Sequence, residues 1–194
     1  MLSIRRPTRQ ELDQAIIDSA AALFARHGYA HTSVQQIADA VGYSKTGLLH
    51  RFPSKEALRG AVVEEFVAEL QAVVAAVEDR PVGPTRDLAV VRAFADLALR
   101  RQGSTALIVS ALTAHETPGD LAWLKAVAHE VFRAFGMDGP DGGADLDRRI
   151  RVYGALGAVS VIALATTDMP REDVHDRIVA TAFDALGHPP STAG

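Results

Sequence analysis

The sequence predicts an all-α protein of about nine helices, arranged as a small N-terminal three-helix unit and a larger C-terminal helical body. Three observations lead to this prediction. Apolar residues recur three or four positions apart along most of the 194-residue chain, which is the spacing of a helix face. We find no segment with the alternation of apolar and polar residues that is typical of a strand. Glycine, proline, serine and threonine interrupt the apolar pattern where helices are expected to begin and end.

Two helices are predicted before residue 42. The first ends at Gly28, a residue that suits a left-handed helix cap. Thr32 or Ser33 can cap the second, short helix, and Gly42 ends it. The residues that these two helices are expected to bury are Leu12, Ile16, Ala20, Leu23 and Phe24, followed by Val34, Ile37, Ala38 and Val41.

The later helices are separated by clear breaks in the pattern. Ser44 can cap a third helix that ends at residues 53–54, and Ser54 opens a fourth helix that runs to about Asp79. Residues 80–84, with two prolines and a glycine, then interrupt the chain. Beyond them we expect helices over residues 85–102, 104–115, 117–135, 144–167 and 170–186, a loop at 136–143 and a disordered tail at 188–194.

Composition and charge exclude several classes of protein. The absence of cysteine excludes disulfide scaffolds, thiolate zinc sites and cysteine nucleophiles. The longest uncharged run, 152–167, has 16 residues, whereas a membrane-spanning helix needs about 20. The N-terminal residues lack the apolar stretch of a secretory signal, so we expect a cytoplasmic protein. The net charge of −4 divides into +3 for residues 1–59 and −7 for residues 60–194, as expected when only the N-terminal end meets phosphate.

Residues 32–58 carry the motif that indicates a function. Two short helices, separated by a glycine turn, have apolar residues on the sides that face each other and polar residues outside. This is the pattern of a helix-turn-helix, whose second helix enters the DNA major groove while helix N-termini meet phosphates. Candidate DNA contacts, chosen as donors, helix N-termini or positions of close approach, are Thr32, Ser33, Gln35, Tyr43, Ser44, Lys45, Thr46, Gly47, His50, Arg51 and Lys55.

The same segment resembles the DNA-binding domain of TetR-family transcriptional regulators. The matching residues are Thr32, Ile37, Ala38, Val41, Gly42, Ser44, Gly47, Leu48, Phe52, Ser54, Lys55, Glu56 and Leu58, preceded by Phe24 and Gly28. The resemblance implies a helix-turn-helix DNA-binding domain over residues 1–54 and an effector-binding and dimerisation domain over residues 55–190. It also implies a homodimer that binds a palindromic operator, most often as a repressor, and is released by a small-molecule effector.

The N-terminal segment has one departure from the family pattern and a basic start. The family usually has a tyrosine, whose hydroxyl contacts a phosphate, where this chain has Leu49. Leucine has no hydrogen-bond donor, so Arg51 is the candidate to supply that phosphate contact. Arg5, Arg6 and Arg9 precede the expected start of the first helix. A basic arm over residues 1–8 either reaches the DNA backbone or minor groove or is a solvated terminus.

The resemblance places the dimer interface on the last two helices, as a four-helix bundle. Small apolar residues form stripes there that suit either close helix approach between subunits or the core of one subunit: Gly154, Ala158, Val161 and Ala165, then Val174, Ile178 and Ala182. An effector needs a cavity with apolar walls and a few polar groups. Candidates by position are Phe94, Ser104, Ser110, Thr113, His115, Trp123, Val127, Phe132 and Tyr153, and the apolar run 107–112 favours a hydrophobic effector.

Two other classes of function are an enzyme and an interaction protein that binds no DNA. The chain has no Gly-x-Ser-x-Gly, no phosphate-binding glycine-rich loop and no His-Glu-x-x-His, so we expect no enzymatic activity and no cofactor. The His-Glu pairs at 115–116 and 129–130 are adjacent in sequence and diverge on a helix, so we expect no metal site. Salt-dependent binding to operator DNA distinguishes a regulator from an interaction protein.

Overall fold

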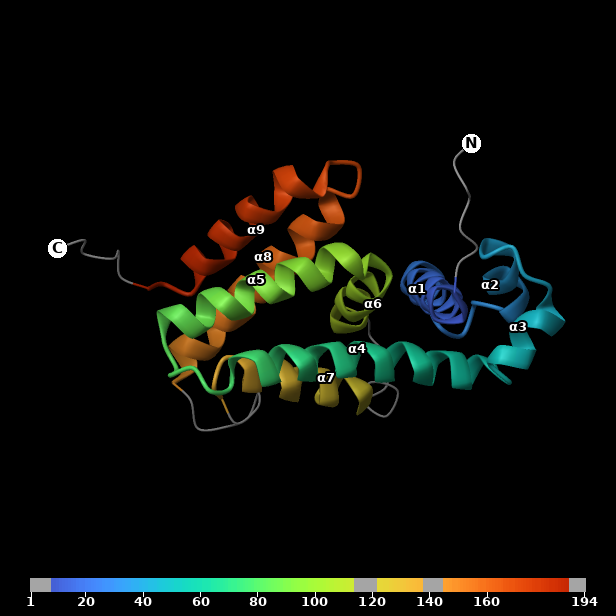
Figure 1. The fold of residues 1–194 in the computed structure, drawn as a ribbon, viewed down its shortest axis with the longest axis horizontal. Coiled ribbons are helices and arrows are strands. Elements are labelled where there is room, and N and C mark those ends of the chain that lie inside the picture. The colour runs from blue at the N-terminus through green and yellow to red at the C-terminus, as the bar shows by residue number, and fades with distance from the viewer. Residues whose placement is uncertain (1–7, 114–121, 138–144, 189–194) are drawn as a thin grey trace.

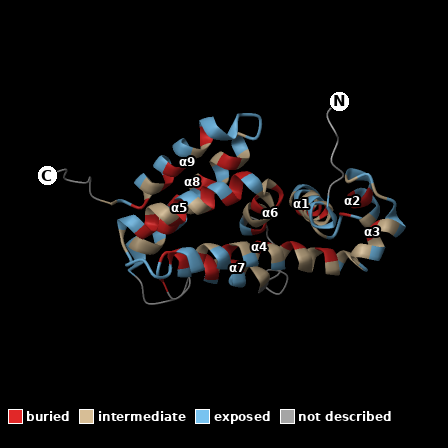
Figure 2. Ribbon diagram, in the orientation of Figure 1, coloured by how far each residue is buried: buried red, intermediate tan, exposed pale blue. Residues whose placement is uncertain are grey.

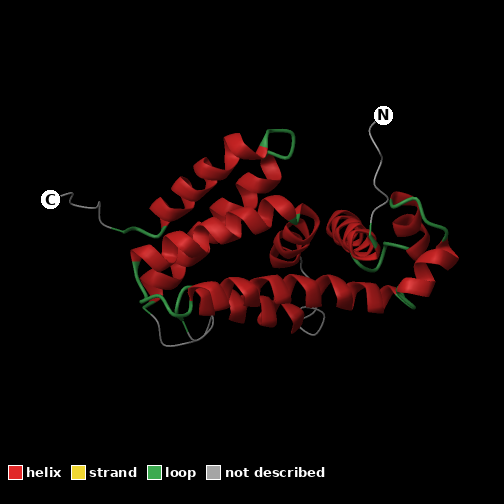
Figure 3. Cartoon of the chain, viewed as in Figure 1, coloured by secondary structure: helices red, strands yellow, loops and turns green. Residues whose placement is uncertain are grey.

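The computed structural model describes residues 8–113, 122–137 and 145–188. These residues form nine α-helices and no strand (Figures 1 and 3), which confirms the predicted fold class. The helices are α1 (Arg9–His27), α2 (Val34–Ala40), α3 (Lys45–Arg51), α4 (Lys55–Val77), α5 (Pro84–Arg100), α6 (Gln102–Thr113), α7 (Ala122–Ala134), α8 (Leu146–Ala165) and α9 (Arg171–Ala185). The arm over residues 1–7, His115, the start of the 117–135 helix, most of the 136–143 loop and the tail from residue 189 lie outside the described residues.

The first helices begin at N-caps that the sequence supplies. Ser33, rather than Thr32, caps α2 in a capping box with Gln36, and Ser44 and Ser54 cap α3 and α4. Arg9 does not precede the first helix, because Thr8 is the N-cap of α1 and Arg9 is its first residue. Local side-chain to backbone hydrogen bonds therefore set where these helices start.

The buried apolar residues form two cores. The N-terminal core consists of Ile16, Ala20, Ala21, Phe24, Ile37, Ala38, Leu48, Leu58 and Val62. The C-terminal core is larger and draws on α4, α5, α7, α8 and α9. Helix α4 belongs to both, with Leu58 and Val62 in the first core and Phe66 and Leu70 in the second. Figure 2 shows buried residues recurring along the whole of this helix.

A tight seam between α1 and α6 joins the two parts of the molecule (Figure 1). At Gly103 a Cβ atom would overlap the backbone oxygen of Asp18 and lie 3.1 Å from the backbone nitrogen of Ala22. Beside the seam, Arg101 forms ion pairs with Glu65 (2.6 Å) and Glu69 (2.5 Å) of α4. Glycine at 103 thus permits a helix contact that no side chain would allow.

A buried carboxylate on α5 joins α5 to α8 and to the residues after α9. Asp87 of α5 is 0% exposed and accepts from Arg148 of α8 (2.7 Å) and contacts Nε2 of His188 (2.8 Å). These contacts hold α8 and the end of the described chain against α5. In the described ranges, no helix is long and apolar enough to span a bilayer.

Candidate nucleic-acid interface

The turn between α2 and α3 fixes the direction in which α3 faces. Gly42 has a φ of +71°, which a residue with a side chain rarely adopts, and the N–H of Tyr43 donates to the Ala38 carbonyl at 2.8 Å. Ile37, Ala38 and Leu48 are each 0% exposed, so the two helices pack through these side chains. The opposite side of α3 consequently faces outward.

Most of the predicted DNA contacts lie on that outward side. Ser33, Gln35, Ser44, Lys45, Thr46 and His50 are exposed. Ser33 and Ser44 cap their own helices, and Gln35 donates to Asp39 at 2.6 Å. Lys45, Thr46 and His50 have no side-chain hydrogen bond or ion pair with any residue the structure describes. We call these three side chains, Lys45, Thr46 and His50, the outer face of α3.

Arg51 is engaged inside the protein. Its Nε lies 2.6 Å from Asp13 Oδ1 and its Nη2 donates to the Arg9 carbonyl at 3.1 Å. The hydrogen bond to Asp13 holds the pKa of Arg51 above its usual value. The guanidinium also lies 5.9 Å from the centre of the Tyr43 ring. Tyr43, another predicted DNA contact, is half-buried. Arg51 therefore ties the end of α3 to the start of α1.

Lys55 is engaged as well, in a cluster centred on Tyr29. Its Nζ donates to the Tyr29 carbonyl at 2.9 Å and lies 4.4 Å from the centre of the Tyr29 ring, while Arg59 lies 4.3 Å from the same ring. The Tyr29 hydroxyl donates to Glu56 at 2.7 Å. Burial, followed by this hydrogen bond, raises the pKa of Tyr29 to about 12. The cluster fixes the first turn of α4 against the end of α1.

Two other candidates have local structural roles. Thr32, a predicted DNA contact, is 2% exposed and its hydroxyl donates to the carbonyls of Leu23 and Gly28. Its side chain is therefore turned into the protein and does not lie on the exposed side with Ser33 and Gln35. Gly47 is half-buried, and a Cβ there would lie 3.1 Å from Ser44 Oγ, the atom that caps α3. A side chain at position 47 would press on the helix cap.

Sequence reasoning assigned no site role to Asp13, Tyr29 or Arg59, and named Glu56 only as a match to the family pattern. Lys55 and Arg59 are four positions apart, a spacing that places them on one side of a helix. Their shared partner Tyr29 lies 26 positions before Lys55, and Asp13 lies 38 positions before Arg51. Such long-range pairs have no signal in a single sequence.

The predicted dimer residues fall into two groups. Val174, Ile178 and Ala182 of α9 are buried in the C-terminal core, so their assignment to a dimer surface was wrong. On α8, Gly154, Val161 and Ala165 are exposed and Ala158 is half-buried. Leu146, Ile150 and Tyr153 of the same helix are 65%, 59% and 50% exposed. These seven residues, with Gly157, form an apolar stripe along α8.

The predicted effector residues are dispersed. Phe94, Val127 and Phe132 are buried in the C-terminal core, and Ser104 is buried at the start of α6. Trp123 is half-buried against that core, and Tyr153 packs edge-on against Phe132, with 5.2 Å between ring centres. Half-buried Ser110 lines a separate surface groove. The side chain of Thr113, like His115, lies outside the described residues.

Comparison with known sequences identifies the family of the N-terminal segment. Residues 16–62 match the family described as bacterial regulatory proteins, tetR family. The chain is 35% identical over 85 residues to the transcriptional repressor DhaR of Mycobacterium sp. strain GP1, which covers 43% of this chain and 41% of DhaR. It is 44% identical over 54 residues to the transcriptional regulator RutR of Escherichia coli K12, which covers 28% of this chain and 26% of RutR. The matches thus span less than half of either relative.

Solved structures share the fold over most of the chain. AibR in complex with isovaleryl coenzyme A and operator DNA is 24% identical, with a TM-score of 0.60 over 89% of this chain and 98% of AibR. The fatty acid degradation regulator FadR of Bacillus halodurans is 17% identical, with a TM-score of 0.61 over 91% of this chain and 98% of FadR. At these identities the similarity establishes the fold: an N-terminal helix-turn-helix domain with a C-terminal helical domain.

Proposed function

Because the N-terminal domain of this chain belongs to the TetR family of bacterial regulatory proteins, we propose that the protein is a transcriptional regulator that binds a palindromic DNA operator as a homodimer. We assign DNA binding to residues 1–54 and effector binding and dimerisation to residues 55–190. Relatives named as repressors, DhaR and AcnR among them, support repression as its mode. Its place of action is the cytoplasm, where the operator is.

The outer face of α3 carries the proposal. Lys45, Thr46 and His50 project from a short helix whose inner side is anchored by Leu48, which is 0% exposed. A rigidly held helix with unengaged donors on its outer side is what major-groove recognition requires. The N-termini of α2 and α3, at Ser33 and Ser44, offer further N–H groups to phosphates.

A salt titration tests DNA binding. The purified protein is titrated with DNA from upstream of its own gene at several salt concentrations, beside random DNA of equal length. With about 6–10 phosphates neutralised per dimer, log affinity should fall against log salt with a slope of about −5 to −9. A flat response, or equal affinity for random DNA, contradicts the proposal and favours an interaction protein.

Matched lysine variants locate the contact. Lys45→Ala should weaken operator binding by about tenfold and reduce the salt slope by about one. Lys125→Ala, an equally charged change at an exposed position of α7, should leave both quantities unchanged. Equal losses in the two variants would place the electrostatic effect in overall charge instead of in α3.

A small, hydrophobic effector is proposed to release the DNA. The AibR complex contains isovaleryl coenzyme A together with operator DNA, which supports a small-molecule ligand for this chain, whereas release of the DNA is the part of the proposal that an operator-binding assay must test. Phe94, Val127, Phe132 and Trp123 supply an apolar environment within the C-terminal domain. Release requires that the effector bind the DNA-incompetent dimer more tightly, and a tenfold loss of operator affinity needs about 1.4 kcal/mol of difference. We propose that α4 transmits this difference by changing the spacing of the two α3 helices.

A further inference from the structure

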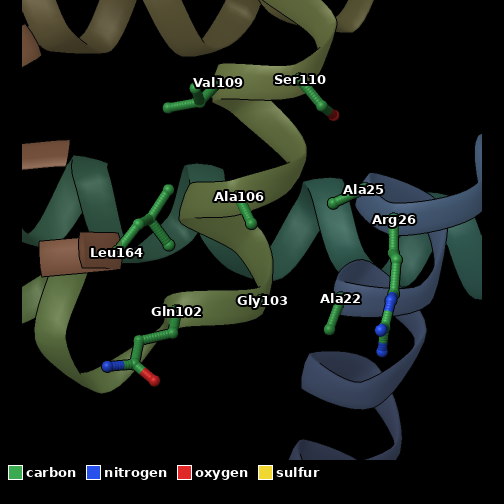
Figure 4. A pocket seen from close by; sticks show the side chains of 9 residues that line it. All are labelled: Ala22, Ala25, Arg26, Gln102, Gly103, Ala106, Val109, Ser110 and Leu164. Carbon is green, nitrogen blue, oxygen red and sulfur yellow. The ribbon is translucent and has the colours of Figure 1, made fainter. Parts of the chain in front are cut away.

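A surface groove lies where the N-terminal helix-turn-helix part meets the C-terminal body. Figure 4 shows α6 crossing its centre, with α1 on one side and the end of α8 on the other. Its volume is about 420 Å³, within the range of small-molecule sites. Its walls are largely apolar, and the side chains involved are Ala22, Ala25, Ala106, Val109 and Leu164.

Arg26 is the one cation among the described residues that line this groove. Arg26 is exposed in the last turn of α1 and extends beside Ala22 (Figure 4). It has no hydrogen bond or ion pair with any residue in the described ranges, in contrast to Arg51 and Arg101. No carboxylate is among the described residues that line the groove. Among the described residues, the groove therefore combines apolar walls with one positive charge that no carboxylate pairs.

We propose that this groove binds an amphipathic carboxylate, whose carboxylate pairs with Arg26 while its aliphatic part covers Ala106, Val109 and Leu164. A guanidinium binds a carboxylate through two parallel hydrogen bonds, and the apolar walls remove the aliphatic chain from water. This site is separate from the aromatic residues of the C-terminal core to which the effector of the proposed function is assigned.

The position of the groove connects it to the seam between α1 and α6. Gly103 lines the groove and is also the residue where α6 meets α1 without room for a Cβ. A ligand bound against α1, α6 and α8 would therefore change the packing of α6 on α1, and with it the orientation of the helix-turn-helix relative to the C-terminal body. This regulatory consequence rests on the proposed function, whereas ligand binding itself does not.

Calorimetric titration with decanoate tests the site on the full chain. Wild type should bind decanoate saturably, and decan-1-ol, which has no charge, should bind about tenfold more weakly. Arg26→Gln should weaken decanoate binding by about tenfold, Arg26→Lys should restore part of it, and Ala106→Trp should abolish it by filling the groove. Arg177→Gln and Ala126→Trp make the same changes at exposed positions of α9 and α7 and should leave the affinity unchanged.

Three results would overturn the site. One is the absence of saturable decanoate binding. Another is binding that neither Arg26→Gln nor Ala106→Trp alters, which would assign decanoate to the C-terminal core. The third is a change of oligomeric state in Ala106→Trp, measured by light scattering, which would assign the groove to a second copy of the chain. If the wild-type protein does not bind operator DNA, the proposed function is contradicted, but the calorimetric evidence for the decanoate site still stands.

Discussion

Basic side chains around the helix-turn-helix differ in whether the fold already engages them. Lys45 is exposed without a partner in the described structure, whereas Arg51 is bound to Asp13 and Lys55 to the Tyr29 carbonyl. A side chain bound within the protein fixes the orientation of the helix that carries it, whatever DNA contact its remaining donors make. Arg51 and Lys55, both predicted DNA contacts, thus also position α3 and α4 at the proposed interface.

Asp13 provides a test of this positioning role. Asp13→Ala removes a negative charge, which by electrostatics alone should strengthen DNA binding. We predict instead a loss of operator affinity of at most about fivefold, because α3 loses its anchor to α1. Fluorescence anisotropy with labelled operator measures it. Asp39→Ala removes the same charge from the exposed side of α2, and a loss of equal size there would contradict the special role of Asp13.

Tyr29 predicts a pH dependence at the alkaline end. Its pKa of about 12 in the fold exceeds the value of about 10 for an unfolded tyrosine. The neutral phenol is therefore favoured by folding, and its contribution to stability is present below pH 10 and lost as the pH rises toward 12. Absorbance at 295 nm should show a late-titrating component that Tyr29→Phe removes and Glu56→Gln shifts to lower pH. A Tyr29→Phe titration identical in shape to that of wild type would contradict this assignment.

At the scale of elements, the seam between α1 and α6 depends on one glycine. Gly103→Ala should destabilise the protein by about 1–3 kcal/mol, because the added methyl meets the backbone of Asp18. Gly60→Ala, within α4, adds a methyl that would have no neighbouring atom within 4 Å, and it should stabilise the protein by about 0.5–1 kcal/mol. Urea denaturation measures both. Equal effects of the two changes would mean that the seam does not constrain position 103.

Among the helices, the start positions could be predicted from the sequence, but the packing of one helix on another could not. Helix starts at Ser33, Ser44 and Ser54 depend on partners three residues away, so the sequence predicts them. The α8 and α9 stripes are alike in composition, yet one is exposed and the other is buried against α5. That choice depends on how separate helices pack, as does the binding of Arg51 by Asp13, and neither follows from local spacing.

For the whole molecule, the apolar stripe of α8 is the surface that we propose for the homodimer interface. It runs from Leu146 to Ala165 and includes Val161, which is 57% exposed, and Gly157 within it allows close helix approach. Val161→Glu should convert the dimer to a monomer by placing a charge in an apolar interface. Sedimentation velocity measures the change. Val82→Glu, at a 61% exposed position between α4 and α5, serves as control, and a dimer that survives Val161→Glu contradicts this surface.

The passage of α4 through both cores limits how the chain can be divided. A fragment cut at residue 54 would lose Leu58 and Val62, which are 1% and 2% exposed in the N-terminal core, and would leave Ile37 and Leu48 without that cover. A fragment extended to residue 77 would complete the core but expose Phe66, Leu70 and Val74 to water. Neither cut leaves both cores covered, so we expect the two parts of the chain to fold as one unit.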